Sequence, residues 1–388
     1  MAKLKRNNSK EIMIRILSVS IGMVLGLVLS LVIARYVIDE YNNNTNWDDS
    51  FLGDKLNTGD NAVETVDTVE DTNKEVETDA VTSVDTEEHV DTTPVIEKNV
   101  LEFSTINIDN SKITSGNLIL VNGQYQYDFE NKTYQTKLYG NRTKVYQLSG
   151  SELALENTTF KALDNMLVQF NKDTNNPSVL VNTAYRSLED QQSIVAARIE
   201  KVGEEETYKY VAKPGHSEHH TGMAADMCFF IDGAQQYFTE NADGKWFDEH
   251  SSDYGFILRY TEEKKDITGC EAEPWHYRYV GIVHAKLMNK LKYCMEEYIT
   301  YLSNYSVDGS EDTTKNQILW VKDDYTTEVI TLGSELPESG HLVYFVAMNS
   351  VENNTVVPIP STFINNKNSY EISGNNVNGF VITIDLTK

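Results

Sequence analysis

Basic residues are scarce in this chain. Its 388 residues include 33 lysines and arginines against 59 aspartates and glutamates, for a formal net charge of −26. Nucleic-acid phosphates require a basic surface, so this balance excludes nucleic acid as a partner. Between residues 39 and 98 only Lys55, Lys74 and Lys98 oppose the acidic side chains, and the tripeptide Val-Asp-Thr recurs. Such a segment repels itself and cannot bury a core, which predicts a disordered acidic linker over residues 39–100.

A long hydrophobic run occurs near the N-terminus, where residues 16–34 carry no charged side chain. About 20 apolar residues span a bilayer, so we predict a transmembrane helix over 16–38. The run is longer than the ~7–15 apolar residues of a signal peptide, and no small-x-small cleavage site follows it, which favours an uncleaved anchor. The preceding basic residues predict a cytoplasmic N-terminus over 1–15 and an extracytoplasmic remainder in a single-pass cell-membrane protein. These residues are Lys3, Lys5, Arg6, Lys10 and Arg15.

Cysteine is also rare, with three residues at Cys228, Cys270 and Cys294. Their spacing fits no zinc-finger pattern, and an odd number leaves at least one thiol unpaired in an exported domain. Cys294 stands among apolar residues at helical spacing, which favours core packing. A disulfide between Cys228 and Cys270 is compatible with the sequence, which does not decide it.

A folded domain is predicted over residues 101–302, where the composition changes. Two short β-rich runs lie at 117–121 and 124–127. Apolar residues at helical spacing from Phe160 to Phe170 predict a helix, and residues 178–183 have the pattern of a buried strand. Another helix is predicted to begin at Ser187, where the sequence resembles a capping box.

Residues 223–231 predict a central strand, because small and apolar residues surround the single charge of Asp226. Side chains alternate along a strand, so Asp226 shares a face with Ala224 and Cys228, and a face lined by small residues has room for a metal. An amphipathic helix over Gly281–Leu302 is predicted to close the domain. Short strands at 318–321, 327–330, 342–346 and 380–384 then predict a small β-rich C-terminal domain over 303–388.

Two short segments carry the residues of a catalytic metal site. Two imidazoles and one carboxylate can hold Zn²⁺ with one position open, and bound zinc activates water near neutral pH. His219, Asp226 and His276 are therefore the candidate ligands. Glu273 is the candidate general base, which would take the proton of the water and pass it to the departing amine. Each residue alone has an ordinary structural explanation, but their joint order and spacing favour the metal site.

The spacing of these residues leaves one geometric question open. Glu273 precedes His276 by three residues, so in an extended segment the two side chains would point to opposite sides unless Pro274 bends the chain. By the same argument His220 would point away from the face that carries His219. This places His220 outside the ligand set.

With these motifs the sequence resembles the VanY-type D-alanyl-D-alanine carboxypeptidases, within a wider group of zinc peptidases that share a Hedgehog-like fold. The pattern Ser-x-His-x-x-Gly-x-Ala-x-Asp begins at Ser217, and Glu-x-Trp-His begins at Glu273. Further agreement lies at residues 185–187, 214–215, 255–260 and 277–281. The resemblance covers about residues 115–300 and implies an α+β domain, in which helices flank a central antiparallel sheet.

The resemblance also implies roles for the matching positions. His219, Asp226 and His276 would bind zinc, Glu273 would act as general base, and Arg186 and Ser217 would bind substrate. It gives neither His216 nor His220 a metal role. A planar guanidinium such as that of Arg186 suits either a terminal carboxylate or the oxyanion of the tetrahedral intermediate, and the sequence does not choose between them.

The function implied is that of a membrane-anchored, zinc-dependent carboxypeptidase that removes the terminal D-alanine from peptidoglycan stem peptides or their precursors outside the cell. An L,D-carboxypeptidase or a peptidoglycan endopeptidase could use the same zinc site, because the shape of the substrate pocket is not visible in the sequence. A non-catalytic cell-wall-binding protein would instead rely on the linker and the C-terminal β region.

Overall fold

The computed structural model describes residues 100–388 except 131–134. No helix in this part of the chain is long and apolar enough to cross a membrane. The helix predicted over 16–38 lies outside the described residues. The acidic linker predicted over 39–100 does so too, except for residue 100. Both therefore stay predictions.

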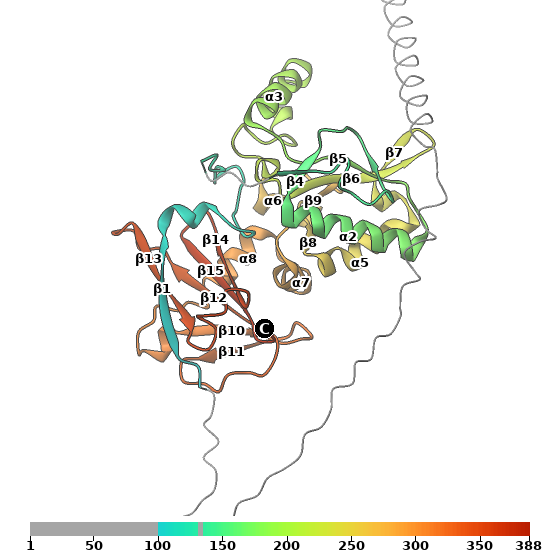
Figure 1. The fold of residues 1–388 in the computed structure, drawn as a ribbon. Coiled ribbons are helices and arrows are strands. Elements are labelled where there is room, and N and C mark those ends of the chain that lie inside the picture. Colours follow the sequence, from blue (N-terminus) through green and yellow to red (C-terminus); the bar gives the residue numbers. More distant parts are fainter. Residues whose placement is uncertain (1–99, 131–134) are drawn as a thin grey trace, which may run out of the picture. The chain divides into compact units, whose positions relative to one another are not determined.

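A six-stranded sheet forms the centre of the first part of the fold (Figure 1). Its strands lie in the order β3-β5-β6-β9-β8, and β7 pairs with β6. Neighbouring strands are antiparallel except for β3 and β5, which are parallel. A sheet of this kind among helices agrees with the predicted α+β fold. The strands are β3 (Gln147–Leu148), β5 (Val179–Thr183), β6 (Ala224–Ile231), β7 (Ala234–Gln236), β8 (Phe256–Leu258) and β9 (His276–Tyr279).

The two faces of this sheet have different chemistry. Helix α2 (Asn157–Thr174) places Leu163 and Phe170 in one hydrophobic core with Met227 and Phe229 of β6. Because side chains alternate along a strand, Asp226 points to the opposite face. One face is therefore a packed core, and the other is available for polar chemistry.

Local sequence signals explain where several elements begin and end. Helix α3 (Leu188–Val202) begins after Ser187, whose Oγ accepts a hydrogen bond from the backbone N–H of Asp190. Helix α2 ends at Asn175, which adopts a left-handed conformation that asparagine tolerates well. The predicted helix over 160–170, the helix start at Ser187, and the strands over 178–183 and 223–231 are confirmed.

The prediction of β-structure at 117–121 and 124–127 is wrong, because this segment forms no strand. Leu118 and Leu120 belong to one hydrophobic cluster, while Ile119 and Val121 belong to another. The segment thus buries alternate side chains on two sides, as a strand does, but it has no neighbouring strand. Its backbone groups bond instead to residues of the C-terminal region.

The single helix predicted over 281–302 is also wrong, because the segment forms two helices. These are α7 (Ile282–Leu291) and α8 (Met295–Leu302). The chain breaks at Lys292, which has a left-handed φ of 57°. Apolar residues continue at helical spacing across the break, so periodicity alone does not reveal it.

All three cysteines are free thiols. The disulfide between Cys228 and Cys270 that the sequence left open is therefore not formed. Cys294 is buried, as predicted, and lies at the start of α8 rather than inside a helix.

The C-terminal region contains a five-stranded antiparallel sheet in the order β11-β10-β12-β15-β14. Its four predicted strands are confirmed, while β13 and β14 were not predicted. Strand β1 (Phe103–Asp109) lies far away in sequence but pairs with β13 (Asn354–Pro360). The other strands are β10 (Gln317–Val321), β11 (Thr327–Thr331), β12 (His341–Ala347), β14 (Tyr370–Gly374) and β15 (Gly379–Asp385).

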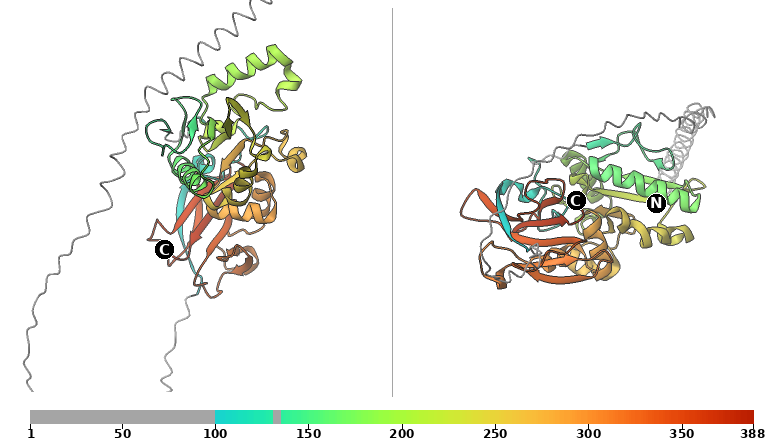
Figure 2. Two further views of the ribbon diagram at one scale, coloured as in Figure 1. Left: turned by 90° about the vertical axis from the view of Figure 1, so that its right-hand side faces the viewer. Right: turned by 60° about the horizontal axis from the view of Figure 1, so that its bottom comes forward.

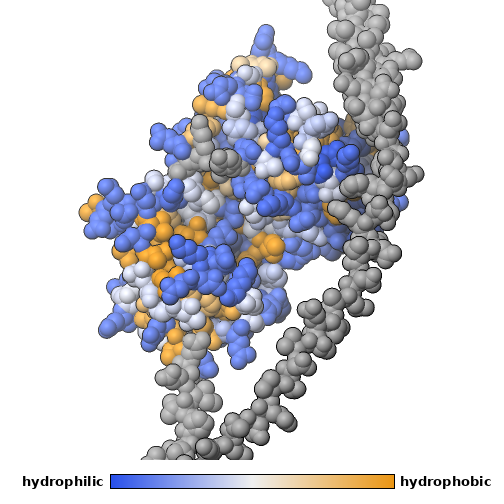
Figure 3. Space-filling model, viewed as in Figure 1, coloured by the Kyte–Doolittle hydropathy of each residue, from blue (hydrophilic) through white to orange (hydrophobic). Residues whose placement is uncertain are grey.

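Both faces of the C-terminal sheet are covered (Figure 2). On one face, Tyr298 and Leu302 of α8 share a hydrophobic cluster with Phe345. On the other, Ile359 of β13 shares a cluster with Ile382. Figure 3 shows hydrophobic side chains gathered over this β region, between hydrophilic ones. The sheet is thus a packed part of the fold, joined to the first part through α7 and α8.

The remaining elements are short. They are β2 (Gln135–Lys137), β4 (Ala154–Glu156), α4 (Glu204–Thr207), α5 (Lys245–His250) and α6 (Lys265–Thr268). The 3₁₀ turns are η2 (Asn110–Thr114), η3 (Glu218–Thr221), η4 (Phe238–Glu240), η5 (Ala242–Gly244), η6 (Ser251–Tyr254), η7 (Glu262–Lys264) and η8 (Thr313–Lys315).

We predict that Leu302→Ala lowers the free energy of unfolding by about 2–5 kcal/mol. Leu302 is fully buried between α8 and the C-terminal sheet, so its truncation leaves a cavity at their junction. Chemical denaturation followed by tryptophan fluorescence measures the change. Ile282→Ala is the matched control, because this side chain at the start of α7 is 48% exposed. Equal losses in the two variants would contradict the prediction.

Candidate metal centre

Strand pairing brings two of the predicted ligands together. In the antiparallel pair β6–β9, Asp226 lies directly opposite His276. Residues in such a position have neighbouring side chains on the same face of the sheet. Oδ1 of Asp226 lies 3.0 Å from Nδ1 of His276. Two residues fifty positions apart in sequence are thus in direct contact on the polar face.

The turn η3 supplies the third predicted ligand, His219. Ser217 precedes the turn, and its Oγ accepts a hydrogen bond from the backbone N–H of His219. Gly222 ends the turn with a φ of 72°, a conformation that glycine adopts without strain. A Cβ at this position would also lie 2.3 Å from the side chain of Gln135. Gly222 thus lets the chain pass from the His219 turn directly into β6.

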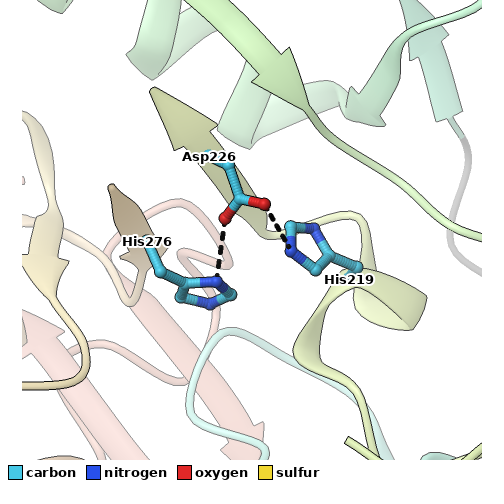
Figure 4. Close-up of side chains that lie close together, drawn as sticks. All are labelled: His219, Asp226 and His276. Carbon is cyan, nitrogen blue, oxygen red and sulfur yellow. Dashed lines mark hydrogen bonds and ion pairs between the residues drawn. The ribbon is translucent and has the colours of Figure 1, made fainter. Parts of the chain in front are cut away.

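The three side chains converge in one small space (Figure 4). Nε2 of His219 lies 3.3 Å from Oδ2 of Asp226. One ligand atom from each of His219, Asp226 and His276 lies within 4.8 Å of the other two. All three side chains are buried, with 4–9% of their surface exposed. The predicted ligand set is therefore assembled.

The second nitrogen of each histidine also has a hydrogen-bond partner. Nδ1 of His219 lies 2.8 Å from the carbonyl oxygen of Ala184, and Nε2 of His276 lies 3.2 Å from Oε2 of Glu218. Histidines that bind metals commonly donate their other N–H to a carbonyl or carboxylate in this way. Two imidazoles and one carboxylate, held at the outside by such acceptors, fit Zn²⁺ with an open coordination position.

The charges of the centre also fit a cation. Burial opposes ionisation of Asp226, but His219 and His276 outweigh it and lower the pKa of this carboxyl. Burial favours the neutral ring of His276, yet hydrogen bonds to Asp226 and Glu218 raise its pKa to about 10. The centre therefore offers an ionised carboxylate beside two imidazoles, a set of donors that suits a divalent cation.

Glu273 lies on the same side as His276. A turn joins them, because the backbone N–H of His276 donates to the carbonyl oxygen of Glu273 over 3.0 Å. Oε2 of Glu273 lies 3.6 Å from Nδ1 of His276. Burial raises the pKa of Glu273 to about 7, and attraction to His276 only partly offsets this. A carboxyl that gains and loses a proton near neutral pH beside the centre has the properties of a general base.

Arg186 reaches the centre from the chain between β5 and α3. Its Nη1 donates to Oε1 of Gln191 over 2.7 Å, and Nε2 of Gln191 donates to the carbonyl oxygen of Ala212 over 2.6 Å. Burial lowers the pKa of the Arg186 guanidinium, while attraction to Asp226 and Glu273 acts in the opposite direction. The structure thus places a partly buried positive charge beside the candidate ligands and the candidate base.

The adjacent histidine His220 has a different role. Its Nε2 accepts from the backbone N–H of Gly215, and its Nδ1 lies 2.8 Å from the carbonyl oxygen of Arg186. The prediction that His220 is not a ligand agrees with these contacts, although the reason given for it was wrong. The segment is a 3₁₀ turn and not extended, and His220 is excluded because both ring nitrogens bond to the backbone.

Comparison with known proteins identifies the family. Residues 152–282 match the family model VanY, D-alanyl-D-alanine carboxypeptidase. The solved structure of VanYB in complex with D-Alanine-D-Alanine is 33% identical to this chain, with a TM-score of 0.40. The match covers 97% of that chain and 47% of this one. Residues 152–282 are a VanY domain. The protein is therefore a peptidase, and all six predicted site residues lie within this domain.

Two further proteins are similar over a larger share of the chain. A D-alanyl-D-alanine carboxypeptidase of Enterococcus faecium is 28% identical over 281 residues, which are 71% of this chain and 78% of that protein. The crystal structure of the vancomycin-resistance D,D-dipeptidase VanXYg, in complex with a D-Ala-D-Ala phosphinate analog, is 28% identical. It matches with a TM-score of 0.58 over 73% of this chain and 99% of that chain. The likeness supports the predicted zinc-peptidase fold.

Two residues that contact the VanY site, Glu218 and Gln191, were not predicted from the sequence. Glu218 occupies an unspecified position of the family pattern, and Gln191 lies within a helix, so the spacing of residues indicates neither. Arg259 and Arg278 offered an indirect signal, because they stand in apolar strand-like segments and buried arginines require anionic partners. Which carboxylate pairs with them is decided by tertiary contacts.

We predict that the VanY domain binds Zn²⁺ and that Asp226→Ala abolishes this binding. Asp226 faces both histidines, so its loss removes the central ligand and leaves a two-ligand site. Equilibrium dialysis followed by metal analysis measures the bound zinc. His250→Gln is the control, because this histidine lies on the surface beside Asp253. Zinc retained by Asp226→Ala, or lost by His250→Gln, would contradict the prediction.

Proposed function

We propose that this protein is a zinc-dependent D,D-carboxypeptidase that removes the terminal D-alanine from peptidoglycan stem peptides or their precursors. One observation carries the proposal. A three-ligand centre, a carboxyl with a pKa near neutrality and a partly buried guanidinium lie together within a VanY domain. The names of the relatives support the substrate, since they include D-alanyl-D-alanine carboxypeptidases and a complex with D-Ala-D-Ala.

His219, Asp226 and His276 would hold the zinc. Zn²⁺ in such a site lowers the pKa of bound water to about 7 and polarises a carbonyl group. Glu273 then accepts a proton from the attacking water and returns it to the amine of the departing D-alanine. Its raised pKa suits both steps, because a group that titrates near the working pH can take up and release a proton.

Arg186 would fix the substrate. The guanidinium can form paired hydrogen bonds with a terminal carboxylate, which would explain why a carboxypeptidase acts only at a chain end. It can also stabilise the oxyanion that forms during hydrolysis. Ser217, 5% exposed and at the start of the turn that carries His219, would contribute a hydroxyl on the same side of the centre.

We further propose that the catalytic domain works outside the cell, on a tether. The apolar run at 16–34 and the acidic segment at 39–98 support this arrangement at the level of sequence. A single membrane anchor followed by a self-repelling linker would hold the enzyme near wall precursors and let it move among them.

We expect the soluble fragment 101–388 to release free D-alanine from a UDP-muramyl pentapeptide, and a chelator to stop the release. Glu273→Gln should lower kcat by about 10²- to 10⁴-fold, because it removes the proton acceptor while keeping the side-chain shape. Glu271→Gln is the matched control, since Glu271 is a more exposed neighbour whose carboxylate lies 4.0 Å from the Lys265 ammonium. An enzymatic assay for free D-alanine measures the release by the unaltered fragment, with and without chelator, and by each of the two variants.

No release from the pentapeptide by zinc-loaded protein would contradict the D,D-carboxypeptidase assignment. Release from a tetrapeptide, or cleavage of cross-linked wall, would then indicate an L,D-carboxypeptidase or an endopeptidase with the same centre. Full biological function of Glu273→Gln in cells would instead indicate a non-catalytic wall-binding protein.

Arg186→Lys should lower kcat/KM by about 10- to 100-fold, because hydrogen bonds to a charged group contribute about 1.5–3 kcal/mol. Lysine keeps the charge but cannot form the paired contacts of a planar guanidinium. Steady-state kinetics with the pentapeptide measure the effect. A change confined to KM would assign Arg186 to the substrate carboxylate, and a change in kcat to the oxyanion. Unaltered kinetics would exclude both roles.

A further inference from the structure

Glu218 is a buried carboxylate whose two oxygens face different partners. Only 2% of its surface is exposed. Oε1 accepts a hydrogen bond from Nε of Arg259 over 2.8 Å and forms an ion pair with Nη1 of Arg278 at 3.2 Å. Oε2 faces Nε2 of His276 at 3.2 Å. One oxygen thus joins Glu218 to the protein interior, and the other meets a predicted metal ligand.

The interior contacts fix Glu218 in place. Burying a lone carboxylate is costly, and the two guanidinium groups compensate for this cost. Arg259 is itself held by both carboxylate oxygens of Glu296, at 2.7 and 3.1 Å. Arg278 donates to the carbonyl oxygens of Asn117, Ile119 and Tyr279. The position of Glu218 is therefore set by contacts with distant parts of the fold, without any metal.

The contact with His276 has a direct consequence for the ring. A neutral imidazole carries its proton on one nitrogen and a lone pair on the other. A carboxylate can only accept a hydrogen bond, so Glu218 selects the form with the proton on Nε2. The lone pair then lies on Nδ1, which is the nitrogen that faces Asp226 and the centre.

We propose that Glu218 is a positioning residue of the metal centre, which fixes the tautomer and orientation of His276 so that Nδ1 binds the metal. This inference rests on the zinc site of the proposed function. Partners of this kind typically contribute about 10- to 100-fold to metal affinity. The sequence gives no hint of the role, because Glu218 lies immediately before His219 yet acts on His276, 58 residues further on.

The test compares zinc affinity in Glu218→Gln and Glu296→Gln, measured by competition with a chromogenic chelator. Both variants remove one carboxylate charge from the same buried network, but only Glu218 touches His276. We expect zinc affinity about 10- to 100-fold weaker in Glu218→Gln and much less affected in Glu296→Gln, whose carboxylate reaches Glu218 only through Arg259. Thermal unfolding of the metal-free variants records the stability lost by each. Equal zinc affinities in the two variants would overturn the proposal.

A second measurement needs no substitution. Nitrogen-15 NMR of the histidine rings in the zinc-loaded wild-type protein should show His276 with a proton on Nε2 and the metal on Nδ1. The opposite arrangement would overturn the proposal even if Glu218→Gln failed to fold. Absence of zinc binding by the wild-type protein would instead refute the proposed function, which distinguishes the two failures.

Discussion

The antiparallel pairing of β6 with β9 is the constraint on which the rest of the site depends. It sets Asp226 opposite His276 on the polar face of the sheet, while the same two strands carry core residues such as Met227 and Tyr277 on the other face. A slip of one residue by either strand would turn its candidate ligand into the hydrophobic core. Packing against α2 therefore fixes the register, and the register in turn assembles the metal centre.

Charge is arranged in layers around this pair. The innermost groups are the candidate ligands, and each histidine has an outer acceptor, which is the Ala184 carbonyl for His219 and Glu218 for His276. Behind Glu218 lie two buried arginines, which make its burial tolerable. A buried network of this kind is costly to assemble, but it holds the ligands in one geometry before any metal arrives. Glu273 and Arg186, the groups that would handle the proton and the substrate, lie beside the centre.

The C-terminal sheet is coupled to this arrangement through the irregular segment at 117–127. Asn376 donates to the carbonyl oxygens of Leu120 and Gln126, and Ser373 accepts from the N–H of Leu118. The same segment accepts from Arg278 through its carbonyl groups and donates to Glu296 through Asn122. Together with the packing of α7 and α8 on the sheet, these contacts make the C-terminal region a support of the catalytic half. Its sheet has no uncovered face within the described residues.

The sequence by itself determined the family of the domain, the three residues that cluster as candidate ligands, the candidate base and most strands and helices. These follow from residue type, spacing and local periodicity, which act over a few residues or within one motif. It could not determine that residues 117–127 lack a strand partner, that Lys292 breaks a helix, or that Pro274 lies in a turn that brings Glu273 to the side of His276. Nor could it show that Glu218 serves His276. Only the tertiary structure decided these points, because each depends on which distant backbone or charge lies nearby, and neither hydropathy nor spacing records that.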